Sequence, residues 1–411
     1  MKPKILFTSA ILAHPPIGGP ELRIENSIKA LAQVSDLYLY CRKTESKIGG
    51  PQATRYLAHY CKEIRFINKV SWEFRIRSKI IKLLSRMFRR SATQQWIDHP
   101  DAMADLLRTV RDINPDLIWI GYGNTSYPLL RYLKQNIATP VVADTDSVWS
   151  RFLSRELPYI EDALKSDRLR KEVADKELEE RKIVSLADVT TAVSSVDEEY
   201  YKQYAGNRSC VMRFSNVIDL ESYAPPPPAA DMAHPSVCVT GSFFAPNCPM
   251  EHATRWFISK VLPLVQVSYP NVKIFILGKG SDTLVGDLAG PNVICKGFVP
   301  SVLPYLCHMD VVAVPLWFES GTRFKILEAG ACRRAVVSTT LGAEGLPTNN
   351  YEHLLIADTP ADFASAICRL ISDSALSVRL ADRLHGLVNA SNGIPSLAAE
   401  AQMILRAVLK G

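Results

Sequence analysis

The sequence predicts an α/β protein made of two doubly wound domains, and three observations support this prediction. Short apolar runs of the length of buried strands alternate with helical patterns in both halves of the chain. The 411 residues are too many for one ordinary core and suit two domains. A run of prolines at 225–228 predicts a stiff segment between them. We therefore expect an N-terminal domain at 1–224, a linker at 225–235 and a C-terminal domain at 236–411.

Composition indicates an ordinary globular protein, with 47% hydrophobic and 22% charged residues. The nine cysteines are scattered and show no paired spacing, which favours reduced thiols in a cytoplasmic protein and argues against a disulfide framework or a metal site. The first apolar run ends at His14-Pro15, and we expect a strand there in preference to a signal peptide.

The +6 net charge belongs to the first domain, because residues 1–224 contain 34 basic and 28 acidic side chains. Such an excess fits phosphate, nucleic acid or an anionic membrane. No helix-turn-helix, zinc-finger or RNA-binding motif accompanies it, so nucleic acid is disfavoured as a partner.

Each expected element of the first domain comes from a strand or helix pattern in the sequence. We expect strands at 4–10, 36–41, 116–121, 141–149, 188–194 and 210–216, and helices at 21–33, 101–113, 126–134 and 161–182. The last of these helices carries mixed charges with many opposite pairs four residues apart, which is typical of a solvated face.

A glycine pair lies between the first strand and the first helix. Gly18 and Gly19 would let backbone amides approach a ligand closely, while an ordinary tight turn with Pro20 at the start of the helix explains them equally well. The pair is not the GxGxxG dinucleotide fingerprint, so it argues little for NAD.

The segment 65–90 is the most basic of the chain, with nine positive charges opposed by Glu73 alone. Its apolar residues fall on one helical face. A helix of this kind could dock on anionic lipid at the inner membrane face or steer a phosphorylated acceptor. The alternative is a core-packed helix whose Arg and Lys stems cover apolar surface.

Asp144 and Asp146 stand where the strand at 141–149 should end. Ligands gather at the carboxyl ends of parallel strands, so both are candidates for holding sugar hydroxyls or accepting a proton. A helix N-cap at Asp146 or Ser147 is the competing interpretation.

The second domain repeats the alternation of strands and helices. We expect strands at 237–241, 271–278, 292–299, 311–316 and 335–339, and helices at 249–269, 300–308 and from about 323, 361, 374 and 395. Residues 310–345 form one βαβ unit, which requires a right-handed crossover.

Two cations occupy the start of the helix in this βαβ unit. Arg323 and Lys325 stand where the helix dipole disfavours positive charge by roughly 0.3–1 kcal/mol each. A multiply charged anion such as a diphosphate would explain them, since a helix N-terminus already favours anions. Otherwise both side chains point into solvent at an ordinary turn.

The sequence resembles the retaining, family-4 type glycosyltransferases of the GT-B fold (glycosyl transferases group 1). Gly18-Gly19-Pro20-Glu21 resembles that family's Gly-Gly loop, and 192–194 and 215–219 resemble two further segments. The C-terminal half carries an ordered set of matches at Gly241, 246–247, 297–299, 314–316, 325–329, 336–339 and 342–346.

This resemblance implies two Rossmann-like domains facing a central cleft, with a nucleotide-sugar donor bound mainly by the C-terminal domain and the last helix able to pack back on the acceptor-side N-terminal domain. Glu328 would receive the ribose hydroxyls, because a carboxylate accepts two hydrogen bonds from a diol. Its alternative is a helical ion pair with Lys325. The remaining implied donor-binding residues are Gly18, Gly19, Gly297, Phe298, Ser320, Gly321, Thr322, Arg323, Lys325 and Leu327.

Three departures from the family pattern matter. The family's first glutamate corresponds to Ser320, and Glu319 is one position early. The usual Arg and Lys after the first C-terminal strand are replaced by residues 242–246, so Arg323 and Lys325 would supply that charge. A frequent histidine of the N-terminal domain is replaced by the segment 144–146.

The implied chemistry is transfer of a sugar to an acceptor hydroxyl, with retention and without a metal or cofactor, in polysaccharide or glycoconjugate biosynthesis. Arg323 and Lys325 would stabilise the leaving diphosphate. Asp146 would orient the acceptor or accept its proton, and Glu319 completes the candidate catalytic set. The acceptor would be a sugar, a lipid-linked sugar or another small molecule. A nucleotide-sugar epimerase and a non-catalytic binding relative remain as alternatives.

Overall fold

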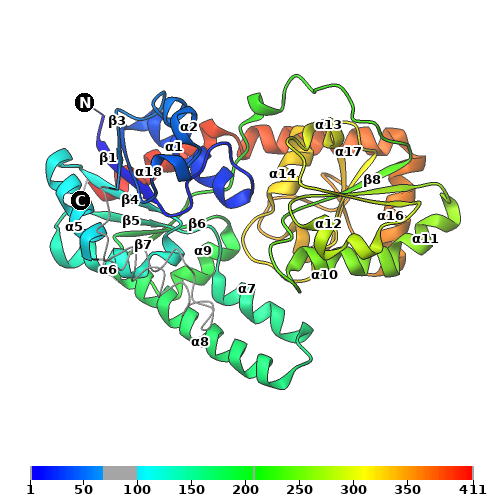
Figure 1. Ribbon diagram of the computed structural model, residues 1–411, viewed down its shortest axis with the longest axis horizontal. Helices are drawn as coiled ribbons and strands as arrows, with labels where there is room; N and C mark the ends of the chain where they lie inside the picture. Colours follow the sequence, from blue (N-terminus) through cyan, green and yellow to red (C-terminus); the bar gives the residue numbers. More distant parts are fainter. Residues whose placement is uncertain (1, 68–99, 207–208, 410–411) are drawn as a thin grey trace. The chain divides into compact units, whose positions relative to one another are not determined.

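The computed structural model describes residues 2–67, 100–206 and 209–409. The chain folds into two compact units, one of residues 1–216 with 394–411 and the other of residues 217–393. Each unit contains one parallel sheet with helices on both faces (Figure 1). The predicted class, two doubly wound α/β domains, is confirmed.

The first unit is built on a seven-stranded sheet with the order β3-β2-β1-β4-β5-β6-β7. Residues 5–9 of β1 are all buried, as expected for a parallel strand that is covered on both faces. The strands are β1 (Lys4–Ser9), β2 (Asp36–Cys41), β3 (Glu63–Phe66), β4 (Leu117–Gly121), β5 (Val141–Asp144), β6 (Val189–Ala192) and β7 (Cys210–Arg213).

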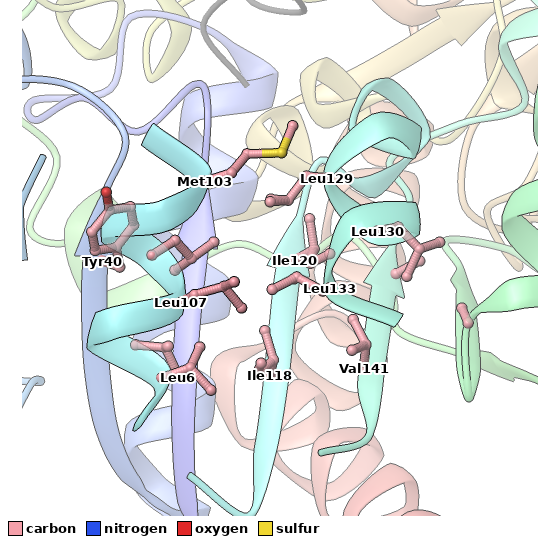
Figure 2. Packing of buried hydrophobic residues seen from close by; sticks show 14 of the residues in the cluster. Leu6, Tyr40, Met103, Leu107, Ile118, Ile120, Leu129, Leu130, Leu133 and Val141 are labelled. Atoms are coloured by element: carbon pink, nitrogen blue, oxygen red, sulfur yellow. The ribbon is translucent and has the colours of Figure 1, made fainter. Parts of the chain in front are cut away.

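Helices cover both faces of this sheet. They are α1 (Gly19–Val34), α2 (Gly50–Leu57), α5 (Pro100–Ile113), α6 (Tyr127–Asn136), α7 (Trp149–Glu156), α8 (Ala163–Leu186), α9 (Ser195–Lys202) and α18 (Ile394–Leu409). Figure 2 shows the core on one face, where leucines of α5 and α6 meet Leu6, Ile118 and Ile120 of the strands. On the other face α1 packs closely, since a Cβ at Gly121 would lie 2.7–2.8 Å from Phe7 and Ile24.

The second unit has a six-stranded sheet with the order β10-β9-β8-β11-β12-β13. Its strands are β8 (Ser236–Thr240), β9 (Lys273–Leu277), β10 (Val293–Gly297), β11 (Val311–Val314), β12 (Ala335–Ser338) and β13 (Leu355–Ile356). Its helices are α10 (Pro249–Trp256), α11 (Leu262–Ser268), α12 (Ser281–Leu284), α13 (Leu303–Leu306), α14 (Phe324–Ala331), α15 (Thr340–Ala343), α16 (Pro360–Ser372) and α17 (Ser374–Ser391).

The helix predicted at 249–269 is interrupted by a wide turn at Phe257–Val261 that joins α10 to α11. Pro263 follows this turn and has no N–H to continue the regular ladder of hydrogen bonds, which accounts for the interruption.

The chain passes from the first unit to the second between Asn216 and Val217, ahead of the proline run. The proline-rich stretch packs within the second unit: Ala230 N–H donates to the Pro304 carbonyl at 2.9 Å, and the His308 ring contacts the Pro227 carbonyl at 2.8 Å. The last helix, α18, belongs to the first unit and lies beside α1 (Figure 1). The Glu400 carboxylate of α18 accepts hydrogen bonds from the N–H and hydroxyl of Ser215.

Several boundaries differ from the prediction. Strand β5 ends at Asp144, and Trp149, which we placed in the strand, begins α7. Elements α2, β3 and α9 are present in addition to those expected from the sequence. Of the basic segment 65–90, residues 68–90 lie outside the described residues, so neither interpretation of it is tested.

Candidate functional site

The strand order of each sheet reverses at its centre, between β1 and β4 in the first unit and between β8 and β11 in the second. Ligands of open parallel sheets bind at the carboxyl ends of the strands beside such a reversal. Most of the predicted site residues lie on the loops and helix starts that follow these strand ends.

In the second unit, the loop after β11 turns sharply before α14. Gly321 has a φ of +76°, a left-handed conformation that favours glycine. Arg323 is the N-cap of α14, and its buried guanidinium donates from Nη1 to the carbonyls of Ser320 (2.8 Å) and Gly321 (2.6 Å). Arg323 therefore holds the shape of the loop in addition to placing a positive charge there.

Lys325 lies in the first turn of α14, as predicted, and its ammonium is poorly compensated. Its Nζ contacts the Met250 Sδ of α10 at 2.9 Å, and a thioether is a weak acceptor. Burial lowers the pKa of Lys325 to about 8, although the charges of Glu319 and Glu328 oppose this decrease. The contact with α10 places this cation at the reversal point between β8 and β11.

Glu328 lies one turn further along α14. Its carboxylate oxygen Oε1 accepts a hydrogen bond from the Tyr223 hydroxyl at 3.1 Å. Burial raises the pKa of Glu328, while the Tyr223 bond and the nearby Lys325 charge counteract the increase. No ion pair of 4 Å or less joins Glu328 to Lys325 among the described residues, so the helical pair considered as an alternative is not formed in this structure.

The other predicted residues of this loop lie close by. The Ser320 N–H donates to Oε1 of Glu319 at 3.3 Å, so one oxygen of this carboxylate contacts the loop backbone. Ser320, Thr322 and Leu327 are buried. Because the Leu327 side chain is only 1% exposed, its packing role is structural and only its backbone is available to a ligand.

Glycines allow the loops after β8, β9 and β10 to approach one another closely. A Cβ at Gly278 would lie 1.7 Å from the Gly241 carbonyl oxygen, and one at Gly280 would lie 2.3 Å from that of Phe243. Gly297 has a φ of +65° and ends β10, and the next residue, Phe298, is 57% exposed. An exposed aromatic ring beside a tight turn is available for stacking on a flat ligand.

In the first unit, the glycine pair begins α1. Gly18 is the N-cap, and its N–H donates to the Glu21 carboxylate at 2.8 Å; the Ile17 N–H donates to the same oxygen at 3.2 Å. A Cβ at Gly18 would meet no atom closer than 3.6 Å, so packing within the described residues does not require glycine there. The glycine pair therefore stays a predicted ligand-binding element.

Asp144 lies in the interior of the first unit. It is fully buried and accepts hydrogen bonds from the Arg23 guanidinium of α1 and the Thr191 hydroxyl of β6. Arg23 also donates to the Asn216 side chain at 2.7 Å. Asp144 thus joins α1 to the sheet, and of the two aspartates only Asp146 remains a candidate for contact with a substrate.

Asp146 accepts hydrogen bonds from the Asn124 side chain and, at 3.4 Å, from the Trp149 indole N–H. Burial raises its pKa, and these bonds and the Arg23 charge counteract the increase. Lys176 donates to the Asn124 carbonyl at 2.6 Å and lies over the Trp149 ring. The helix N-cap predicted as an alternative is not formed by Asp146 or Ser147, because the N-cap of α7 is Val148.

The structure brings Glu319, Ser320, Gly321, Thr322, Arg323, Lys325, Leu327 and Glu328 together on one loop and helix. Sequence reasoning missed Tyr223, Met250 and Asn124. Asn124 follows the end of β4, so the strand-end rule could have identified it, whereas no local pattern marks Tyr223 or Met250. Among the described residues, no group of three or more His, Cys, Asp or Glu could hold a metal ion. No described helix has the length and apolar character needed to cross a bilayer.

Residues 234–373 match the family described as Glycosyl transferases group 1, and this stretch contains Gly297 and the whole of α14. A Klebsiella pneumoniae protein, described as an uncharacterized 44.6 kDa protein in cps region, is 27% identical over 146 residues. The match covers 33% of this chain and 37% of that protein, well under two thirds of its length.

Three solved structures resemble the whole chain. Sucrose-phosphate synthase from Thermosynechococcus elongatus has a TM-score of 0.71 and 16% identity over 100% of both chains. HepE from Anabaena, in complex with UDP and glucose, has a TM-score of 0.63 and 15% identity over 98% of this chain and 99% of that one. TarM from S. aureus, whose complex includes UDP, has a TM-score of 0.61 and 11% identity over 98% and 99%. At these identities the likeness shows the fold, which is GT-B.

Proposed function

We propose that this chain, which has the GT-B fold and carries a glycosyl transferases group 1 domain at 234–373, transfers a sugar from a nucleoside-diphosphate sugar to an acceptor hydroxyl. The observation that carries the proposal is Lys325. A half-buried cation whose hydrogen-bonding contact is a thioether, at the strand-order reversal of the matched domain, is suited to a polyanionic ligand.

The donor diphosphate would lie at Lys325 and the start of α14. When the bond to the anomeric carbon breaks, negative charge develops on the leaving diphosphate. A fixed cation in a dehydrated site stabilises that charge without reorganising, and this is usually the largest electrostatic contribution to catalysis. Arg323 would add its positive charge from its place beside the loop carbonyls to which it donates. Ser320, Gly321 and Thr322 would line the path by which the diphosphate reaches the start of α14.

The nucleoside would lie next to the diphosphate. Glu328 would accept the ribose hydroxyls one turn along α14, and Gly297 with the exposed Phe298 would border the base. HepE was solved with UDP and with UDP-glucose, which supports a nucleotide-sugar donor for this chain as well.

On the acceptor side we place Asp146 of the first unit. Because burial raises its pKa, this carboxylate is a better proton acceptor than an ordinary aspartate, and Asn124 fixes its orientation. Gly18 and Gly19 would approach the donor diphosphate. We further propose that configuration is retained, that no metal or cofactor takes part, and that the protein acts in the cytoplasm, with segment 65–90 as a contact to the inner membrane face.

The product would be a polysaccharide or glycoconjugate built on a sugar, a lipid-linked sugar or another small acceptor. The occurrence of the Klebsiella relative in a cps region supports this part of the proposal.

A second candidate, donor binding without catalysis, is favoured by one observation. Ser320 occupies the position of the family's first glutamate, and one oxygen of the neighbouring Glu319 carboxylate accepts a hydrogen bond from the Ser320 N–H. A serine at this position lacks the carboxylate that the family pattern would place there.

Incubation of the full-length protein with radiolabelled UDP- and GDP-sugars tests the proposal. We expect slow hydrolysis of one donor, accelerated by a crude lipid or oligosaccharide extract. Lys325→Met should lower the rate about 10²–10³-fold, as expected for loss of one transition-state charge contact. Lys260→Met, which removes an exposed lysine of the same unit, is the control. Nucleotide binding without turnover would favour the second candidate, and turnover unaffected by Lys325→Met would refute the site.

A further inference from the structure

We propose that Tyr223 is a positioning residue for the nucleoside of the donor: its hydroxyl fixes the carboxylate of Glu328 in the orientation that receives the ribose. This inference rests on the proposed function, and it assigns a role to a residue outside the βαβ unit and outside the matched domain, 105 positions before Glu328.

The geometry is specific. Tyr223 is the last residue of a short 3₁₀ helix, Leu220–Tyr223, directly before the proline-rich stretch. Its hydroxyl donates to Oε1 of Glu328 at 3.1 Å, and both groups are largely removed from solvent. The other carboxylate oxygen, Oε2, accepts no hydrogen bond from any described residue. Tyr223 therefore engages one oxygen and leaves the other available.

A carboxylate with one oxygen held and the other available is suited to binding the two hydroxyls of a ribose. An ionised carboxylate is purely an acceptor, and a vicinal diol supplies two donors. A side chain with one oxygen held has lost most of its torsional freedom before the ligand arrives, so less ordering remains to be done when the diol binds. Oε1 also keeps a second lone pair, so the Tyr223 bond does not exclude the ligand.

Tyr223 also influences which form of Glu328 is present. The groups that face Glu328 are Lys325 and Cys332 from α14, Cys238 from β8, and Tyr223, with Asp219 near the phenol. Burial favours the neutral acid, whereas the Tyr223 bond and Lys325 favour the carboxylate. Removing the phenol hydroxyl should raise the pKa of Glu328 further and make it a poorer acceptor at low pH.

A simpler explanation is that Glu328 merely satisfies a buried phenol. The two explanations differ in one measurable respect. A structural bond would affect the stability of the protein and all nucleotides alike, whereas a positioning bond affects the contribution of the ribose hydroxyls specifically.

The experiment is calorimetric titration of the full-length protein with UDP and with 2′-deoxy-UDP. The titrations are repeated with GDP and 2′-deoxy-GDP. We expect the wild type to prefer the ribonucleotide about tenfold. In Glu328→Gln the affinities for the ribonucleotide and the deoxynucleotide should differ by less than about twofold. Tyr223→Phe should weaken the ribonucleotide about three- to tenfold and the deoxynucleotide less than twofold. Tyr351→Phe, an exposed tyrosine of the same unit, should behave as the wild type.

A pH series gives a second readout. As the pH is lowered, the affinity of Tyr223→Phe for the ribonucleotide should fall more steeply than that of the wild type, and Glu328→Gln should lack this additional dependence. Thermal unfolding of each variant confirms that it is folded at the temperature of titration.

The outcomes separate the two proposals. If Glu328→Gln loses the ribose preference and Tyr223→Phe keeps it, the inference about Tyr223 is wrong while the proposed function stands. If Glu328→Gln also keeps the preference, the ribose site is misassigned. Absence of binding by either nucleotide would contradict the proposed function, and the inference with it.

Discussion

At the level of single residues, the environment of the Lys325 side chain differs from that of a stable core. Its ammonium is desolvated and contacts a thioether, so in the folded state its pKa is about 8, below the ordinary value of 10.5. A lowered pKa means that the folded protein binds this proton less tightly than the unfolded chain does. The charged side chain therefore destabilises the fold below about pH 8, and this cost disappears as the pH rises toward 10.5.

We accordingly expect Lys325→Met to stabilise the protein at pH 7, by about 1–3 kcal/mol, although it removes the proposed diphosphate contact. The gain should shrink as the pH is raised from about 8 to about 10.5. Urea unfolding monitored by circular dichroism at several pH values measures this difference. Lys260→Met should stay within about 0.5 kcal/mol of the wild type at every pH, and a destabilised Lys325→Met at pH 7 would show that the ammonium is compensated in the native state.

At the level of elements, the position of α14 is set by its packing on α17. Gly330 of α14 lies against α17 so closely that a Cβ would be 2.8 Å from Val388 and 3.0 Å from Leu384. The Gly330 carbonyl also contacts the His385 ring at 3.0 Å. Because Lys325 and Glu328 lie on the same short helix, any shift of α14 moves both.

Gly330→Ala should therefore destabilise the protein by about 1–3 kcal/mol through overpacking and weaken UDP binding at the same time. The matched control is Gly386→Ala within α17, where a Cβ would meet nothing within 4 Å. That substitution should be neutral or stabilise by up to about 1 kcal/mol, because alanine is the better helix former. Urea unfolding and UDP titration of both variants compare the two positions; equal stability of the two variants would rule out the overpacking argument.

At the level of the whole molecule, the two units carry different parts of the proposed reaction. The second unit holds α14 and the matched domain, whereas the first is assembled from segments at both ends of the chain. Arg23 links α1 to β5 and to Asn216, and Glu400 of α18 links the last helix to Ser215, so the segment entering the second unit is tied to the first unit from two directions.

Hydrogen exchange of the full-length protein with and without UDP tests this distribution. At UDP concentrations about 100-fold above Kd, amides in 311–331 that exchange only through unfolding of the second unit should slow about 100-fold. We expect additional protection at 17–22 if Gly18 and Gly19 contact the donor, and none in α18. Protection confined to the first unit would contradict the proposal, because it would show that UDP binds there and not at α14 of the second unit.

The sequence by itself determined the two α/β domains, most strand positions, and the βαβ unit that carries Arg323, Lys325 and Glu328, because apolar runs, glycine turns and helix starts are properties of neighbouring residues. Only the tertiary structure decided the partners of these residues. The Tyr223–Glu328, Lys325–Met250 and Arg23–Asp144 contacts join residues 105, 75 and 121 positions apart. Such contacts depend on how whole helices pack against the sheets, and no local pattern encodes them. The same reason explains why Asp144 and Asp146, which look equivalent in the sequence, have different roles: burial beside Arg23 assigns one to the core, and packing beside Asn124 leaves the other at the strand end.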